Sequence, residues 1–302
     1  MSIKIIHNPY SARWTSQQRK PEMIAALDQV GLKYDLDTTE GPGHAIELAA
    51  QAVRDGYDTI LAAGGDGTLG EVVNGIIKGA GDSSLPNFGV LPLGTANDLV
   101  YNLKLPNDIQ GMAEVIARGY TRKIDVCKVN DRYFVNNAGI GLEPYITVQQ
   151  QKIKRLKGEI RYMAATLIGI AHNPKWEMHI QWESGEYTGP TTLVSIGNGA
   201  RTGGFFMAPH ASLFDGVMTF TFGFISGRLQ KLTVLPMALQ EGEGNFTTHP
   251  KIHEYDTHWI KITSTPSPTH TDGELFDLTA TEFQYSIEPA RLPVLMNPDA
   301  QS

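Results

Sequence analysis

The chain has 302 residues, of which 41% are hydrophobic and 19% are charged. This length and composition predict one large or two medium globular domains and exclude a disordered chain. The net charge of −7 argues against an all-over nucleic-acid-binding surface, so we expect no nucleic-acid partner.

The rest of the composition bears on the cellular compartment. Cys127 is the single cysteine, which excludes a disulfide framework and fits a reducing compartment. Residues 1–6 lead directly into an apolar strand, without the pattern of a signal peptide. No apolar run approaches the roughly 18 residues that a membrane span needs. We therefore expect a cytoplasmic protein, and leave open whether it contacts the inner face of the membrane peripherally.

The first elements alternate between strand and helix. Residues 3–7 read as a buried strand that ends in a turn containing Asn8, Pro9 and Ser11. A helix is expected over 17–30, because Gly31 is a typical helix C-cap, and a second strand over 33–39. The Gly41-Pro42-Gly43-His44 turn then opens another helix.

The next strand, residues 60–63, runs into a glycine turn with one acid, Gly64-Gly65-Asp66-Gly67-Thr68. Apolar residues at helical spacing follow it over 69–77 and leave Glu71 and Asn74 together on another side of the helix. A glycine turn at a helix N-terminus offers backbone N–H groups to an anion. A plain structural turn is the alternative reading of two glycines alone.

A second loop of the same kind follows the strand expected at 88–91. It reads Pro92-Leu93-Gly94-Thr95-Ala96-Asn97-Asp98-Leu99. Alternating strands and helices predict parallel βαβ units, whose ligands bind beyond the carboxyl ends of the strands. We therefore expect both loops to lie at the same edge of one sheet and to form a binding site there.

From residue 122 the apolar period changes to two, with a hairpin turn at Asn130-Asp131. Residues 150–171 look helical, and short alternating stretches follow at 176–182, 191–197, 217–224, 258–263 and 281–288. Such spacing favours a mainly antiparallel, β-sandwich-like second domain. We expect domains at 1–125 and 126–288, with a tail at 289–302 that returns to the first domain.

These motifs resemble those of a known family. The Gly64–Leu69 string with Glu71 and Asn74 is similar to the nucleotide-binding signature of diacylglycerol kinases and related lipid kinases. Residues 91–98 resemble that family's second motif, which NAD kinases do not share in this form. The resemblance implies an N-terminal α/β domain like that of NAD kinases and phosphofructokinases. It also implies an ATP- and Mg²⁺-dependent kinase that phosphorylates the hydroxyl of a lipid such as diacylglycerol.

The resemblance also implies roles for single residues. Nucleotide-binding positions carry over to Asn8, Pro9, Ser11, Thr39, Gly64, Gly65, Asp66, Gly67, Thr68, Glu71, Asn74, Gly94, Thr95, Asn97, Asp98 and Asp125. Asp66, Asp98 and Asp125 would position Mg²⁺ and its waters. The turn differs from the family at Ala12, where glycine is usual, so a phosphate would be held less closely there.

The catalytic and metal positions lie later in the chain. His270-Thr271-Asp272-Gly273-Glu274 matches the family's Asp-Gly-Glu motif, which implies Glu274 as the base, helped by Asp272. Both carboxylates would face the cleft unless a glycine turn separates them. The family's structural cation site carries over to the Asp215 side chain and the carbonyls of Ser212 and Val217, and such ligands suit Mg²⁺ or Ca²⁺. A plain Asp-Gly turn is the alternative.

The segment 152–167 could reach a lipid surface. Its apolar residues Ile153, Leu156, Ile160, Met163 and Leu167 form one stripe if the segment is helical. Its charged residues are Lys152, Lys154, Arg155, Lys157 and Arg161 against the acid Glu159. This pattern is typical of an interfacial membrane helix, and more often of a helix packed on its own domain with a solvated charged face.

Two other functions stay open. A soluble-acceptor kinase of the NAD kinase type shares the first glycine motif but lacks the 91–99 motif and the Asp215 turn. A catalytically silent nucleotide- or lipid-binding module would explain Ala12, although every carboxylate that the mechanism needs is present.

Overall fold

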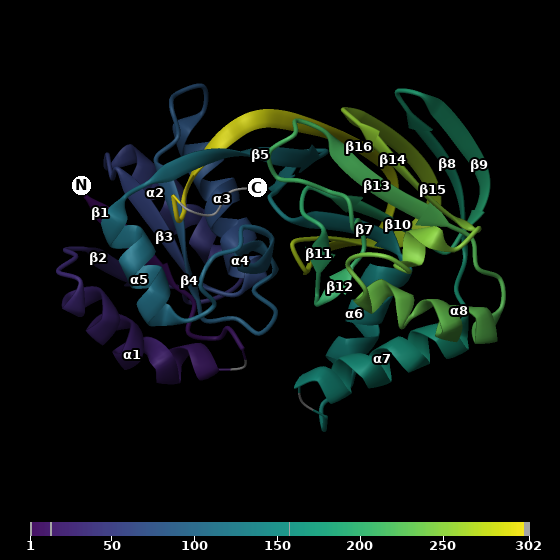
Figure 1. Cartoon of the computed structure of the whole chain (residues 1–302), viewed down its shortest axis with the longest axis horizontal. Helices are drawn as coiled ribbons and strands as arrows, with labels where there is room; N and C mark the ends of the chain where they lie inside the picture. Colours follow the sequence, from purple (N-terminus) through teal and green to yellow (C-terminus); the bar gives the residue numbers. More distant parts are fainter. Residues whose placement is uncertain (1, 13, 157, 299–302) are drawn as a thin grey trace. The chain divides into compact units, whose positions relative to one another are not determined.

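The computed structural model describes residues 2–12, 14–156 and 158–298. The chain divides into two compact units (Figure 1). Unit 1 contains Met1–Val126 and Pro289–Ser302, and unit 2 contains Cys127–Glu288. The chain therefore enters unit 2 through strand β5 (Thr121–Val129) and leaves it through the long strand β16 (Glu274–Leu295).

Unit 1 is built on a parallel sheet in the order β4-β3-β1-β2. Its strands are β1 (Ile3–His7), β2 (Asp35–Thr38), β3 (Thr59–Gly64) and β4 (Asn87–Pro92). Every residue of β3 is buried, which explains the apolar run that follows Thr59. The parallel register places the carboxyl ends of β1, β3 and β4 at one edge of the sheet.

Within the described part of unit 1, three helices connect these strands and two more follow β4. They are α1 (Thr15–Gln29), α2 (His44–Arg54), α3 (Asp66–Ala80), α4 (Asp98–Asn102) and α5 (Ile109–Arg118). Helix α2 packs against α3 and α1 packs against α5. The buried face of α3 includes Leu69, Val73 and Ile76, as its spacing predicts.

The end of the chain completes unit 1. Val294 of β16 pairs in parallel with Phe88 of β4, and Met296 N donates to the Tyr120 carbonyl at 2.9 Å. Leu292, Val294 and Leu295 are buried. The last strand therefore contributes core side chains to a unit whose other elements lie in the first 126 residues.

Unit 2 is mainly antiparallel. Its central ladder runs β14-β13-β10-β7-β15-β16, and β15 also pairs with β8, which pairs with β9. The strands are β6 (Arg132–Phe134), β7 (Asn137–Gly141), β8 (Trp176–Trp182), β9 (Gly185–Thr191), β10 (Leu193–Gly197), β13 (Met218–Gly223), β14 (Ile252–Thr257) and β15 (Trp259–Thr271). Strands β11 (Arg201–Thr202) and β12 (Phe205–Phe206) form a separate small ribbon.

Short helices pack on this sheet. They are α6 (Leu142–Lys152), α7 (Gly158–His172), α8 (Arg228–Val234) and two 3-10 turns, η1 (Met237–Leu239) and η2 (Phe246–Thr248). Helix α6 packs against α7, and α7 against α8. A large hydrophobic core on this sheet includes Ile140, Ile180 and Phe220. A smaller cluster, which includes residues of α8 and η2, is formed around Phe205, Ile225 and Phe246.

The architecture of an α/β part followed by a mainly antiparallel part is confirmed. One prediction is wrong: the continuous helix over 150–171 is two helices, because α6 ends at Lys152 and α7 begins at Gly158. Ile153, at the break, has extended backbone and packs on the core of unit 2. The apolar periodicity continued across a change of chain direction, which periodicity cannot detect. Lys157, part of the predicted basic face, lies outside the described residues.

Candidate active site

The two glycine loops of unit 1 lie against each other. Leu93 N donates to the Gly64 carbonyl at 3.0 Å. A Cβ atom on Gly94 would lie 2.5 Å from the Gly65 Cα, so glycine is required for this close approach. The prediction that both loops lie at one edge of the sheet is therefore confirmed.

The turn after β1 joins the same edge through side-chain hydroxyls. Asn8 Nδ2 donates to Thr68 Oγ1 at 2.9 Å, and Ser11 Oγ lies 3.2 Å from the same oxygen. Gly65 N donates to Ser11 Oγ at 3.4 Å. Three strand ends thus meet around the N-terminus of α3, where backbone N–H groups and the helix dipole favour an anion.

Two helices at this edge begin with an acidic residue. Asp66 is the partly buried first residue of α3, and its Oδ1 accepts a hydrogen bond from Leu99 N at 3.4 Å. Asp98 is the buried first residue of α4. The dipole of a helix favours negative charge near its first turn, and both side chains lie in such a turn. Asp66 thereby connects the first turns of α3 and α4.

Other predicted nucleotide residues have visible structural contacts. Glu71 is buried and accepts hydrogen bonds from Gly43 N at 2.7 Å and Ala45 N at 3.2 Å, so it caps the N-terminus of α2. Asn74 Nδ2 donates to the Gly70 carbonyl at 2.7 Å. Thr39 N donates to the His7 carbonyl at 2.8 Å, which fixes Thr39 beside β1.

The turns themselves are held in unusual backbone conformations. Asn97 has a φ of 49° and its Nδ2 donates to Asn107 Oδ1 at 2.9 Å. Ala12 has a φ of 48°, the left-handed region that favours glycine. Pro9 is buried beside this turn, and Thr95 is exposed in the second loop. The conformation of Ala12 gives a physical reason for the glycine that is usual there.

Asp125 is buried near the end of unit 1. Its Oδ1 accepts a hydrogen bond from Ala290 N at 2.6 Å. The carboxylate therefore holds the returning segment that begins at Pro289. An outward-facing strand position, the commoner fate of a lone Asp, is excluded.

In unit 2, Asp272 is almost fully buried, with 3% of its surface exposed. Its carboxylate accepts backbone hydrogen bonds from Val135 at 3.1 Å, Asn136 at 2.8 Å and Asn137 at 3.1 Å. Burial raises the pKa of Asp272 to about 6, although these donors and the Arg132 charge oppose the shift. The side chain therefore fixes the segment between β6 and β7.

Glu274 lies beyond a turn that separates it from Asp272. Asp272 and Gly273 both have positive φ, 46° and 79°, and join β15 to β16 with Thr271 paired to Glu274. Of the two arrangements left open by the sequence, the structure therefore shows the one in which a glycine turn separates the carboxylates. Glu274 Oε2 lies 3.2 Å from Arg132 Nη2, and Arg132 Nε donates to Thr271 Oγ1 at 2.6 Å. Glu274 is thus partly exposed and oriented by a cation.

The Asp215 loop has the hydrogen bonds of a turn. Asp215 Oδ1 accepts from Val217 N at 3.2 Å, and Ser212 Oγ accepts from Phe214 N at 3.3 Å. Gly216 has a φ of 78°. Within the described ranges, no group of three or more His, Cys, Asp or Glu side chains is placed to hold a metal ion.

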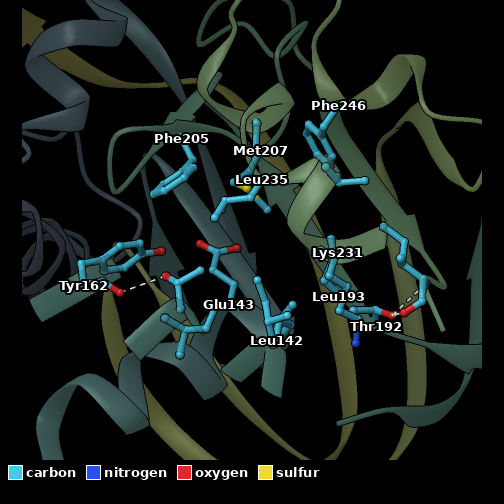
Figure 2. A pocket seen from close by; sticks show the side chains of 16 residues that line it. Leu142, Glu143, Tyr162, Thr192, Leu193, Phe205, Met207, Lys231, Leu235 and Phe246 are labelled. Carbon is cyan, nitrogen blue, oxygen red and sulfur yellow. Dashed lines mark hydrogen bonds between the residues drawn. The ribbon is translucent and has the colours of Figure 1, made fainter. Parts of the chain in front are cut away.

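Unit 2 also contains an apolar pocket that the sequence did not predict (Figure 2). It has an empty volume of about 670 Å³, part of it open to solvent. Its lining includes Leu142 and Glu143 of α6, Tyr162 of α7, Phe205, Leu235 and Phe246. The sequence signal that could have indicated it is Glu143, an acid that directly follows the apolar residues Ile140 and Leu142.

A buried cation also borders the pocket. Lys231 of α8 is 5% exposed, and its Nζ donates to Asn173 Oδ1 at 2.6 Å. Burial lowers the pKa of Lys231 to about 8. Its aliphatic stem lines the pocket while the amine is bound elsewhere, so the interior of the pocket stays largely apolar.

Comparisons with known proteins identify the family. The family model "diacylglycerol kinase catalytic domain" matches residues 2–129, and the model "YegS C-terminal NAD kinase beta sandwich-like domain" matches residues 136–296. The chain is 32% identical to a diacylglycerol kinase of Staphylococcus aureus (strain JH9) over 274 residues, which cover 90% of this chain and 85% of that protein.

Solved structures agree on the fold. A diacylglycerol kinase structure from Bacillus anthracis superposes with a TM-score of 0.73 at 20% identity, covering 99% of this chain and 98% of that one. An NAD kinase from Archaeoglobus fulgidus, solved with ATP, gives a TM-score of 0.54 at 11% identity, covering 99% and 95%. The motifs, the paired glycine loops and the relatives converge, and the chain belongs to the diacylglycerol kinase family of lipid kinases.

Proposed function

We propose that the protein transfers the γ-phosphoryl group of ATP to the hydroxyl of a lipid such as diacylglycerol, with Mg²⁺ as the cofactor. The observation that carries the proposal is the junction of the Gly65 and Gly94 loops, with Asp66 and Asp98 opening two helices beside it. Backbone N–H groups at such a junction bind phosphate oxygens, and nearby carboxylates accommodate a hydrated cation.

The residues present fit Mg²⁺ held partly through water and phosphate. Asp66 and Asp98 offer hard oxygen ligands at helix N-termini, where Mg²⁺ usually keeps several waters and takes one or two carboxylates. Bound there, the cation would neutralise charge on the transferring phosphoryl group. Asp125, with one oxygen on Ala290 N, would orient a water of this shell. The Asp215 loop remains our candidate for a separate structural Mg²⁺ or Ca²⁺ ion.

Glu274 is the proposed general base. It would accept the proton of the lipid hydroxyl as that oxygen attacks the γ-phosphorus and ADP leaves. Its pairing with Arg132 Nη2 at 3.2 Å holds the carboxylate in one orientation. Asp272 is better described as a positioning residue, because its carboxylate is occupied by three backbone donors.

The lipid requires an apolar environment, and unit 2 offers one. The pocket beneath α7 and α8 has the apolar lining that an acyl chain needs. Tyr162 and Thr166 of α7 face this pocket, while Ile160, Met163 and Leu167 of the same helix are exposed. Helix α7 therefore has one apolar face on the pocket and another on the surface.

We infer that this outer face meets the membrane. Helix α8, packed against α7, adds exposed Leu229 and Leu232, and basic Lys154, Arg155 and Arg228 are exposed nearby in the chain. Exposed apolar residues beside basic ones are typical of an interfacial surface on anionic lipid. None of the helices in the described ranges is both long and apolar enough to cross a bilayer.

The decisive experiment incubates the protein with labelled ATP and Mg²⁺, separately with a total lipid extract and with NAD. Labelled lipid supports the proposal, and labelled NADP would support a soluble-acceptor kinase. The A. fulgidus NAD kinase shares the fold, which is why this second acceptor belongs in the assay. No labelled product with either acceptor would favour a catalytically silent module.

Glu274→Gln tests the proposed base. It should lower kcat by roughly 10²-fold while the KM for ATP changes little, because the residue is assigned to the acceptor. Loss of ATP binding instead would assign Glu274 to the nucleotide. Glu282→Gln, an exposed acid farther along β16, is a matched control that should leave kcat unchanged.

A further inference from the structure

The apolar pocket of unit 2 contains a carboxylate oxygen with no hydrogen-bond partner among the described residues. Glu143 lines the pocket, and 9% of its surface is exposed. Its Oε2 atom is buried and unpaired. Figure 2 shows this carboxylate lying between the side chains of Leu142, Phe205 and Leu235. An unpaired buried carboxylate oxygen is costly, so a donor from a bound molecule or from water is expected there.

The other carboxylate oxygen is fixed in place. Oε1 accepts a hydrogen bond from Asn137 Nδ2 at 3.3 Å and lies 2.9 Å from His270 Nε2. His270 is 2% exposed, and neither of its ring nitrogens completes a well-aligned hydrogen bond with the part of the chain that the structure describes. The pair of Glu143 and His270 is therefore buried and in contact, and it still has unused hydrogen-bonding capacity.

The backbone of β7 leaves room for this pair. A Cβ atom on Gly139 would lie 2.7 Å from His270 Nε2 and 2.9 Å from Glu143 Oε2. Gly139 is also the residue that pairs with His270 across the β7–β15 ladder. A glycine at this position therefore leaves the space that His270 Nε2 and Glu143 Oε2 occupy.

Strand β15 of this ladder also pairs with β16, which begins at the proposed base Glu274. His270 lies two residues before Asp272, and Asn137 N donates to Asp272 Oδ1 at 3.1 Å. Thr271, next to His270, pairs with Glu274 across the turn. A lipid seated in the pocket would present its polar end to Glu143 of α6, beside His270 of β15, and β15 pairs at Thr271 with Glu274 of β16.

We propose that Glu143, positioned by His270, accepts a hydrogen bond from a second donor group of the lipid, distinct from the hydroxyl that is phosphorylated. This inference rests on the proposed function. Diacylglycerol has one donor, the hydroxyl that receives the phosphate. The site therefore favours lipids with a further hydroxyl or N–H beside that hydroxyl, such as a monoacylglycerol or an N-acyl amino alcohol. Sites built to bind a donor reject analogues that lack it, because their own polar groups stay unpaired.

The test compares three lipids of matched acyl length in one neutral detergent: a 1-monoacylglycerol, its 2-O-methyl ether and a diacylglycerol. For the unmodified protein, kcat/KM for the monoacylglycerol should exceed that for the ether by roughly 10- to 100-fold, the scale of a hydrogen bond to a charged group. Glu143→Gln should reduce this ratio to near one. An N-acyl amino alcohol in a fourth arm distinguishes an N–H donor from a second hydroxyl.

Glu177→Gln is the matched control, because Glu177 is an exposed acid on β8. It should leave the ratio between the lipids unchanged. If Glu143→Gln fails to fold by circular dichroism, the comparison of the two monoacyl lipids on the unmodified protein decides alone. Equal kcat/KM for those lipids would overturn the inference and assign the Oε2 site to water.

A binding measurement separates this inference from the proposed function. The rise in Tm produced by each lipid without ATP should be larger for the monoacylglycerol than for the ether, and this difference should vanish in Glu143→Gln. If no lipid is phosphorylated but the difference in Tm is present, the kinase proposal is refuted and the proposed hydrogen bond to Glu143 is supported. If lipids are phosphorylated without a preference for the monoacylglycerol over its ether, the proposed hydrogen bond to Glu143 is refuted and the kinase proposal is supported.

Discussion

Asp66 and Asp272 are each followed by a glycine, but the two Asp-Gly pairs lie between different secondary-structure elements. Asp66 opens helix α3 after a parallel strand and is partly exposed. Asp272 lies in a tight turn between two antiparallel strands, is 3% exposed, and accepts three backbone hydrogen bonds. One carboxylate is placed at a helix N-terminus where a ligand can reach it, and the other is used to hold the fold.

The contrast shows what an acid next to a glycine can indicate. The glycine gives a turn in both cases, but the elements on either side decide where the carboxylate points. A turn from strand to helix directs the acid toward an anion-binding helix end. A turn between antiparallel strands directs it back onto a neighbouring segment. Substitutions of these two aspartates should therefore affect different properties.

The largest effect is expected for Asp66→Asn. It removes a charge at the phosphate-binding edge and should lower kcat by about 10²- to 10³-fold, with the Tm almost unchanged. A phosphoryl-transfer assay measures kcat, and a thermal melt of the same preparation measures the Tm. Asp82→Asn, at an exposed position after α3, is the control and should be fully active. Near-normal turnover in Asp66→Asn would refute the role given to this edge.

Asp272→Ala should show the reverse pattern. It leaves the backbone N–H groups of residues 135–137 without their acceptor and should lower the free energy of unfolding by about 3 kcal/mol. The corresponding fall in Tm is roughly 6–12 °C. An unchanged Tm would contradict the structural role, and would return Asp272 to the candidates for direct catalysis.

The pH dependence of stability sharpens the contrast. Because burial raises the pKa of Asp272 from 3.8 to about 6, the folded protein binds this proton more tightly than the unfolded chain. That stabilisation is full below about pH 4 and is lost as the pH rises through 6, with an amplitude of at most about 3 kcal/mol. Asp272→Asn should therefore be most destabilised, relative to the unmodified protein, at pH 4. A difference in Tm that is constant from pH 4 to 7 would contradict this.

The smallest effect is expected for Ala12→Gly. Ala12 has a φ of 48°, which costs an L-residue about 1 kcal/mol, whereas glycine adopts it without strain. Part of the gain is offset by the greater freedom of glycine in the unfolded chain, so the stability should rise by less than about 1 kcal/mol. Ala45→Gly, inside α2, is a matched control that should lower the Tm.

The sequence predicted the parts of the molecule whose determinants are local. The loops at Gly65 and Gly94 follow apolar strands directly, so strand order and glycine content were enough to place them together. The same reasoning gave the hairpin at Asn130-Asp131, which joins β5 to β6. The division into an α/β part and an antiparallel part followed from the change of apolar period near residue 122.

Contacts between distant segments could not be predicted in this way. Asp272 is bound by residues more than 130 positions earlier, so its motif gave no sign of a structural role. The pocket around Glu143 is lined by residues of α6, α7, α8 and other separate segments, so no single stretch of sequence could predict it. The break between α6 and α7 was missed because the apolar spacing continues through it.

The return of β16 to unit 1 has a consequence for biosynthesis. Val294 pairs with Phe88, and Ala290 N is bound by Asp125, so unit 1 lacks one strand until the ribosome has also produced all of unit 2. Domains usually fold in the order of synthesis. Here the unit translated first is the one completed last, and its partly assembled sheet must remain soluble while about half of the chain is still being translated.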